Sequence, residues 1–300
     1  MDSIIKHIDH DYNSIKNIIK TLTADNEFLA SYSIGKSVLG KDIPAIKIGK
    51  SDEYILYVAA FHGSERITAI IILKFLEELC CAVKNKGNIS GIDARGILKA
   101  RGAIFVPMIN PDGCEIAAKG SAAGGAFSSK ISRLCGGNYK KWNANARGVD
   151  INHNFNAGWE LLHKRERECG IYGPSSTRFG GLKPESEPET LALTELCHSV
   201  KIRHALAFHS QGEVIYWDYN NKSIPRAKKM AEIMATSSGY ALDVPIGLAM
   251  GGGFKDWFIE ELGRPGFTIE VGLGENPLPP ESVGDLYDKL REMMTLCLLM

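Results

Sequence analysis

Short apolar runs rich in β-branched and aromatic residues alternate with helical segments along most of this 300-residue chain. The runs predicted to be strands are residues 54–60, 102–108, 204–209, 213–217 and 266–272. The segments predicted to be helices are residues 65–83, 187–199, 224–237 and 280–298. This alternation is typical of an α/β fold, in which a twisted, mixed and mostly parallel sheet carries helices on both faces.

Two local features refine the expected organisation. Ser186 and Glu189 have the spacing of a capping box, which predicts a helix start there with Pro188 in its first turn. Residues 114–147 are rich in Gly, Ala, Ser, Asn and Lys and predict a long irregular loop that borders the active site. Because no repeat or linker divides the sequence, residues 1–300 are expected to form a single domain.

Composition disfavours several classes of protein. The 35 Lys and Arg residues balance 35 Asp and Glu residues, so charge gives no support for a nucleic acid or an anionic membrane as the main partner. No apolar stretch reaches the roughly 20 residues that a membrane helix needs. The start of the chain lacks the apolar core of a secretory signal, and the 7 cysteines form no CxxC pair. We therefore expect a cytoplasmic protein with reduced thiols.

Candidate metal ligands follow two of the predicted strands. His62 and Glu65, in the sequence HGSE, come directly after residues 54–60, and His209 ends the strand at 204–209. Ligands bind outside the carboxyl ends of such strands, and His, His and Glu form one of the sets that hold zinc in hydrolases. Each piece alone has another interpretation: HxxE also fits a surface turn, and a lone histidine in an apolar run is commonly a hydrogen-bonded core residue.

Two further groups of charged residues have contrasting interpretations. Glu270 lies inside the apolar strand 266–272, where a carboxylate is costly unless it is paired or has a function. A buried salt bridge is the alternative explanation for Glu270. The charge run HKRERE, residues 163–168, is interpreted as a solvated helix face without functional meaning.

Taken together, ordered motifs along the chain resemble the zinc carboxypeptidase family. The motifs are HGSE (62–65), NPDG (110–113), NARGVDIN (145–152), FHSQGE (208–213), GGGFKDW (251–257) and FTIEVG (267–272), and the resemblance runs from about residue 32 to residue 279. The resemblance implies one Zn²⁺ per chain bound by His62, Glu65 and His209, with Glu270 as the general base. It also implies that Arg147 stabilises the oxyanion, although Lys141 aligns there as an alternative.

The chain departs from the family pattern in the region that binds the substrate. Carboxypeptidases usually have Asn-Arg where this chain has Asn152-His153, and that arginine clamps the terminal carboxylate of the substrate. A tyrosine usually lies eight residues before Asp256, where this chain has Leu248. An ordinary C-terminal exopeptidase is therefore not the leading hypothesis.

A narrower resemblance accounts for these departures. The sequences NARGVDIN, GGLKPESEPET, HSQGEVIYW and GGGFKDWF are similar to those of bacterial peptidases that cut the γ-D-glutamyl to meso-diaminopimelate bond of murein peptides. The resemblance implies a small murein peptide as substrate and a role in recycling. Asn152, His153 and Lys255 are the expected substrate-binding residues, since the residue before Asp256 lines the specificity pocket in such enzymes and a lysine there would attract a carboxylate. The alternative for Lys255 is a side chain turned out to solvent.

Three other functions remain as alternatives. They are an ordinary zinc carboxypeptidase, a small-molecule N-deacylase of the same fold, and a non-catalytic protein that binds wall peptides. The deacylases usually keep the Asn-Arg pair that is missing here, and a non-catalytic relative would be expected to have lost metal ligands that are all present.

Overall fold

A mixed sheet forms the centre of the molecule in the computed structural model, which describes residues 3–5, 10–222 and 224–300. Its strands lie in the order β1-β2-β6-β3-β7-β10-β8-β9. They are β1 (Leu29–Lys36), β2 (Asp42–Ile48), β3 (Tyr54–Ala59), β6 (Gly102–Val106), β7 (Ile202–His209), β8 (Val214–Tyr216), β9 (Ala241–Asp243) and β10 (Gly266–Glu270). The central strands β6, β3, β7 and β10 are parallel, and antiparallel strands flank them on both sides. A separate small ribbon pairs β4 (Asn88–Ile89) with β5 (Ile92–Asp93).

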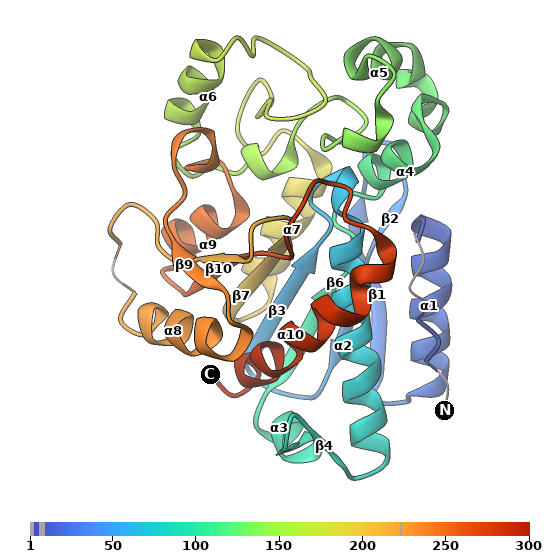
Figure 1. The fold of residues 1–300 in the computed structure, drawn as a ribbon, viewed down its shortest axis with the longest axis vertical. Coiled ribbons are helices and arrows are strands. Elements are labelled where there is room, and N and C mark those ends of the chain that lie inside the picture. Colours follow the sequence, from blue (N-terminus) through green and yellow to red (C-terminus); the bar gives the residue numbers. More distant parts are fainter. Residues whose placement is uncertain (1–2, 6–9, 223) are drawn as a thin grey trace.

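Helices cover both faces of this sheet (Figure 1). Alternate residues of β3 explain why: Ile55 and Tyr57 face one core cluster, and Leu56 and Val58 face the other. The first cluster is covered by α1 (Tyr12–Asp25), α2 (Ile67–Lys84), α8 (Ala227–Ser238) and α10 (Val283–Cys297), and the second by α7 (Pro188–Ser199) and α9 (Phe254–Leu262). The expected α/β class, with helices on both faces of a mixed sheet, is confirmed.

The remaining helices are short. They are α3 (Ala94–Ala100), α4 (Pro111–Lys119), α5 (Ser128–Cys135) and α6 (Trp159–Glu168). In Figure 1, α5 and α6 lie at the upper end of the molecule, beyond the carboxyl ends of β3 and β7, while both marked chain ends lie at the lower end. The upper end therefore holds the segments that border the strand ends, where the predicted ligands lie.

The prediction of an irregular loop over residues 114–147 is wrong for much of its length. That interval contains the end of α4, the whole of α5, and 3-10 turns at Ser121–Phe127 and Tyr139–Lys141. Gly120 and Gly136 have positive φ angles of 85° and 56° directly after α4 and α5. Positive φ angles favour glycine, so these glycines mark the ends of short helices.

The predicted helix start with Pro188 in its first turn is confirmed, but the predicted capping box at Ser186 does not form. Helix α7 begins at Pro188, with Glu187 as its N-cap residue. The Ser186 hydroxyl donates to Glu187, and the Glu189 carboxylate accepts from the backbone N–H of Val38. The Glu189 carboxylate is thus used in a buried contact with Val38, just after β1, and does not cap its own helix.

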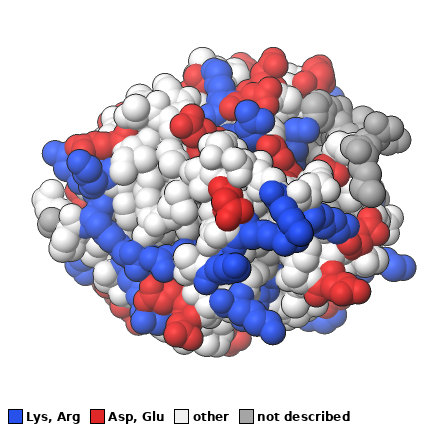
Figure 2. Space-filling view, turned by 90° about the horizontal axis from the view of Figure 1, so that it is seen from below, with Lys and Arg blue, Asp and Glu red and all other residues white. Residues whose placement is uncertain are grey.

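The surface and the helices give two further observations. None of the helices in the described ranges is long and apolar enough to cross a bilayer. On the face shown in Figure 2, groups of Lys and Arg side chains lie among Asp and Glu side chains. The start of the chain, for which the sequence analysis expects no secretory signal, falls partly outside the described residues.

Candidate metal centre and active site

The predicted ligands come together at the carboxyl ends of β3 and β7. These two strands are parallel neighbours, so His62, just beyond β3, lies close to His209, the last residue of β7. Glu65 ends a 3-10 turn, Gly63–Glu65, for which His62 is the N-cap residue. The chain order strand, turn and helix therefore places all three side chains at one edge of the sheet.

The turn that carries His62 and Glu65 is held by close backbone packing. A Cβ atom on Gly63 would lie 2.3 Å from the carbonyl oxygen of Gly113 and 2.6 Å from that of Trp142, so only glycine fits there. The side-chain amide of Asn110 donates to the carbonyl of Phe61 at 2.9 Å, and its oxygen accepts from the N–H of Gly113. The NPDG motif thus fixes the segment that presents the ligands.

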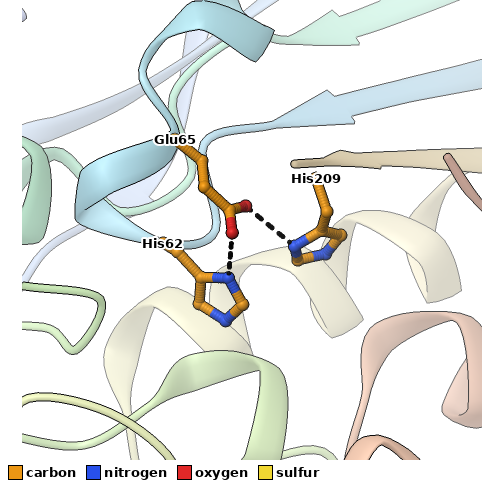
Figure 3. A group of neighbouring side chains, drawn as sticks. All are labelled: His62, Glu65 and His209. Carbon is orange, nitrogen blue, oxygen red and sulfur yellow. Dashed lines mark hydrogen bonds and ion pairs between the residues drawn. The ribbon is translucent and has the colours of Figure 1, made fainter. Parts of the chain in front are cut away.

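One carboxylate joins the two histidines (Figure 3). Oε1 of Glu65 lies 2.9 Å from Nδ1 of His62, and Oε2 of Glu65 lies 3.1 Å from Nδ1 of His209. One donor atom from each residue lies within 4.8 Å of the other two. Two imidazole nitrogens and a carboxylate oxygen at this spacing are donors that suit Zn²⁺.

Two residues outside this group orient it. A carboxylate oxygen of Asp150 lies 3.1 Å from Nε2 of His62, so the other ring nitrogen, Nδ1, is the one left for a metal. The Asn276 amide donates to Glu65 Oε1 at 3.4 Å and to the carbonyl of Ser210 at 2.7 Å. Asp150 lies in the motif NARGVDIN, and Asn276 lies in the sequence NPLP. Neither residue was assigned a role from the sequence.

The electrostatics of the group favour a cation. Burial alone would lower the pKa of His62, but the charges of Glu65 and Asp150 outweigh it and raise that pKa well above its usual value. Burial would raise the pKa of Glu65, and the two histidines lower it instead to about 2. The negative potential that favours a proton on His62 would equally favour a divalent cation. The residues therefore fit the zinc that the family resemblance implies.

Glu270 lies beside this group at the end of β10. In the parallel pairing of β10 with β7, Glu270 is opposite His209. Burial, together with the charge of Glu65, raises the pKa of Glu270 to about 8. No salt bridge of Glu270 is found among the described residues, so the alternative of a buried ion pair receives no support.

A cavity of about 130 Å³ adjoins the predicted ligands. The predicted residues that line it are His62, Asn152, His153, His209, Lys255 and Glu270, and Tyr216 and Leu248 line it as well. The structure thus brings together two of the predicted metal ligands, the predicted base and the three predicted substrate-binding residues. Leu248 lines the cavity at the position where the family usually has a tyrosine.

Lys255 is buried in this cavity and is not turned out to solvent. Only 5% of it is exposed, its Nζ forms an ion pair with Asp256, and it donates to the carbonyl of Asp218 at 2.6 Å. Lys255 therefore lines the cavity while its ammonium group is paired with Asp256. Asn152 uses its side-chain oxygen to accept from the N–H of Phe254, which ties it to the start of α9.

The structure does not bring Arg147 or Lys141 into the cavity lining. The side chain of Arg147 is 46% exposed, and its guanidinium lies 3.4 Å from the carboxylate of Glu187. The ammonium of Lys141 lies 3.4 Å from the carboxylate of Glu275, at the surface. The oxyanion role of either side chain stays a prediction.

The interpretation of residues 163–168 as a solvated face is wrong for one residue. Glu166 is completely buried, and its carboxylate accepts from the rings of His153 and His163. Helix α6 turns its other charged residues outwards, among them Lys164, Arg167 and Glu168. A run of charges does not reveal which member faces inwards, because the His153 and Gly180 N–H groups that donate to Glu166 come from other segments.

Known proteins resemble this chain over most of its length. A family model described as zinc carboxypeptidase matches residues 15–287. Gamma-D-glutamyl-L-diamino acid endopeptidase 1 from Lysinibacillus sphaericus is 38% identical over 283 residues, which are 93% of this chain and 70% of that protein.

Two solved structures show the same fold. Carboxypeptidase A from Helicoverpa armigera superposes with a TM-score of 0.74 at 18% identity, over 99% of this chain and 76% of that chain. Murein-tripeptide amidase MpaA from Escherichia coli O157 superposes with a TM-score of 0.56 at 22% identity, over 89% of this chain and 91% of that chain.

Proposed function

The chain belongs to the zinc carboxypeptidase family and is a metallopeptidase, and from this premise we propose that it hydrolyses the amide bond between γ-linked D-glutamate and meso-diaminopimelate in murein peptides. The observation that carries the proposal is Lys255, a buried cation in the cavity beside the predicted metal ligands. A diaminopimelate residue and a γ-linked D-glutamate bring carboxylates into that cavity, which lysine would attract. The name of the relative from Lysinibacillus sphaericus supports the same bond.

The chemistry would be shared between a metal and the chain. His62, Glu65 and His209 would hold Zn²⁺, which supplies a Lewis acid and lowers the pKa of a bound water. Glu270 would take the proton from the attacking water and return it to the leaving amine. Asn152, His153 and Lys255 would orient the peptide so that its scissile carbonyl faces Glu270.

Arg147 would stabilise the developing negative charge on the scissile carbonyl oxygen. It pairs with Glu187 in this structure, so its guanidinium would have to turn towards the cavity to do so. A cytoplasmic location is part of the proposal, because small wall peptides are recycled there and the described cysteines are all free thiols.

A pair of isomeric peptides tests the proposed bond. The zinc-loaded protein is expected to cleave L-Ala-γ-D-Glu-meso-diaminopimelate with a kcat/KM at least about tenfold above that for the α-linked isomer, since a single well-placed contact contributes that much. Preference for the α-linked peptide would instead support an ordinary carboxypeptidase. Cleavage only of small N-acyl amino acids would support a deacylase, and binding without cleavage would support a wall-peptide-binding protein.

Replacing Lys255 by alanine tests the substrate class. We expect kcat/KM for diaminopimelate peptides to fall. The expected loss of transition-state stabilisation is about 1 to 3 kcal/mol, the range for hydrogen bonds to charged groups. Peptides with lysine in place of diaminopimelate lack the side-chain carboxylate and should be much less affected. Steady-state kinetics on the two peptides measures the difference, and equal losses would show that Lys255 does not contact that carboxylate. Lys222→Ala, which removes a surface lysine paired with Glu260, is the control.

A further inference from the structure

A buried carboxylate behind the cavity collects several N–H donors. Glu166 has no exposed surface, and Oε1 of Glu166 lies 2.9 Å from Nδ1 of His153, while Oε2 lies 3.1 Å from Nδ1 of His163. The backbone N–H of Gly180 donates to both oxygens, at 3.1 and 3.2 Å. An ionised carboxylate can only accept, so each histidine presents a protonated Nδ1 to Glu166.

The approach of these groups depends on glycine at position 180. A Cβ atom there would lie 2.5 Å from the carbonyl oxygen of His153 and 3.1 Å from Oε1 of Glu166. The indole N–H of Trp159 donates to the carbonyl of Gly180 at 2.9 Å, which fixes this segment on α6. The first glycine of the GGLKPESEPET motif thus lies against the contact between Glu166 and His153.

The second histidine is held in its neutral form by its other neighbours. Nη2 of Arg167 lies 3.2 Å from Nε2 of His163, and a guanidinium can only donate. Nε2 of His163 therefore accepts, and its single ring proton is on Nδ1, which faces Glu166. The ring also stacks on Trp159, with ring centroids 4.7 Å apart and planes within 10°.

His153 is therefore the ring that can balance the charge of Glu166. A buried carboxylate is costly without a cationic partner, and neutral His163 does not supply one. The Nδ1 edge of His153 is occupied by Glu166, so its Nε2 edge is the part left for the cavity that His153 lines. A doubly protonated ring in this position presents one N–H donor with a positive charge to that cavity.

We propose that Glu166 is a positioning residue that, with His163 and Gly180, fixes His153 so that Nε2–H donates to a carboxylate of the bound peptide. The inference rests on the proposed function, since it takes its ligand from the same peptide. His153 would bind the carboxylate through one charge-assisted hydrogen bond, whereas an arginine would form two parallel ones. The carboxylate is either the α-carboxylate of the γ-linked D-glutamate or a main-chain carboxylate of diaminopimelate.

Glu166→Gln tests the positioning role, with Glu168→Gln as the matched control on the same helix. Glu168 is exposed, and its carboxylate lies 3.9 Å from the ammonium group of Lys164. We expect Glu166→Gln to raise KM for L-Ala-γ-D-Glu-meso-diaminopimelate about tenfold or more with kcat changed less than about threefold, as for lost substrate binding. The metal content should not change, and Glu168→Gln should behave like the unmodified protein. A KM for Glu166→Gln equal to that of the unmodified protein would overturn the proposal.

The double variant separates positioning from general damage to the fold. Because Glu166 acts through His153, adding Glu166→Gln to His153→Ala is expected to raise KM by less than about twofold over His153→Ala alone. Losses that multiply would show that Glu166 acts independently of His153. Nitrogen-15 NMR of the histidine rings gives a second readout: the ring of His153 should carry protons on both Nδ1 and Nε2, and the doubly protonated population should fall in Glu166→Gln.

Amidated peptides identify the carboxylate and keep this inference separate from the proposed function. The peptide with D-glutamate α-carboxamide and the peptide with diaminopimelate amide should differ in KM, and His153→Ala should abolish the effect of one of these changes. If the zinc-loaded protein cleaves no γ-linked peptide, the proposed function fails. In that case, calorimetry compares the affinity of L-Ala-γ-D-Glu with that of its amide, and the affinity of diaminopimelate with that of its amide. A weaker affinity of one amide supports the inference, and affinities that do not depend on either amidation overturn it.

Discussion

Replacing Glu270 by glutamine is expected to lower kcat by about 10²- to 10⁴-fold, the contribution of general acid–base catalysis, while the protein keeps its metal and its affinity for substrate. Glutamine has the size of glutamate but cannot accept and return a proton. Glu270 ends β10 opposite His209, and its side chain lines the cavity beside His62. The loss should therefore fall on the chemical step.

Single-turnover kinetics with saturating peptide measures this loss directly. Glu275→Gln is the matched control, because Glu275 follows shortly after Glu270, is 86% exposed and pairs with Lys141. It should leave kcat unchanged. Turnover by Glu270→Gln close to that of the unmodified protein would remove Glu270 from the mechanism.

His209→Ala is expected to abolish zinc binding and peptide hydrolysis together. His209 supplies one of the donor nitrogens that lie within 4.8 Å of the other ligand atoms. The loss of metal affinity should exceed the about 10- to 100-fold that removal of an orienting partner costs, since a ligand itself is lost. Metal analysis of the purified protein and calorimetric zinc titration measure the effect.

His204→Ala is the matched control for that experiment. His204 lies on the same strand and is equally buried, but its Nε2 faces the carbonyl of Cys297. Its removal should lower stability and leave one zinc per chain. A His209→Ala protein that still binds zinc tightly would contradict the ligand assignment.

The fold could be predicted, and the candidate metal ligands could be identified, because local pattern and topology agree. The apolar runs that became β3 and β7 are parallel neighbours in the sheet, so the residues directly after them meet at one edge. His62, Glu65 and His209 lie close to their strand ends, where a shift of one or two residues in a predicted boundary does not move them to another face. The rule that ligands bind at the carboxyl ends of strands made these residues candidates, and the resemblance to zinc carboxypeptidases implied their role as metal ligands.

The residues that the sequence did not identify are those whose partners are distant. Glu166 belongs to a run of charges, and only the approach of His153 and Gly180 gives it a buried acceptor role. Asn276 contacts Glu65 across 211 positions of the chain. Spacing within a motif carries no information about such contacts, because they depend on how separate segments pack.

The same limit explains the error at residues 114–147. Glycine and small polar residues predict irregular structure on average, yet Gly120 and Gly136 follow the helices α4 and α5, and α4 packs against the turn Gly63–Glu65. A glycine at a helix end and a glycine in a flexible loop look alike in a sequence. The position of the glycine relative to the helices appears only in the fold.

The most direct test of the account is the identity of the products from L-Ala-γ-D-Glu-meso-diaminopimelyl-D-Ala, measured by mass spectrometry with zinc-loaded protein. This peptide contains both a γ-glutamyl bond and a terminal D-alanine, so one experiment separates the proposed reaction from ordinary carboxypeptidase action. The account predicts L-Ala-γ-D-Glu and diaminopimelyl-D-Ala as the first products. Release of free D-alanine with the γ-glutamyl bond intact, or an unchanged peptide, would contradict it.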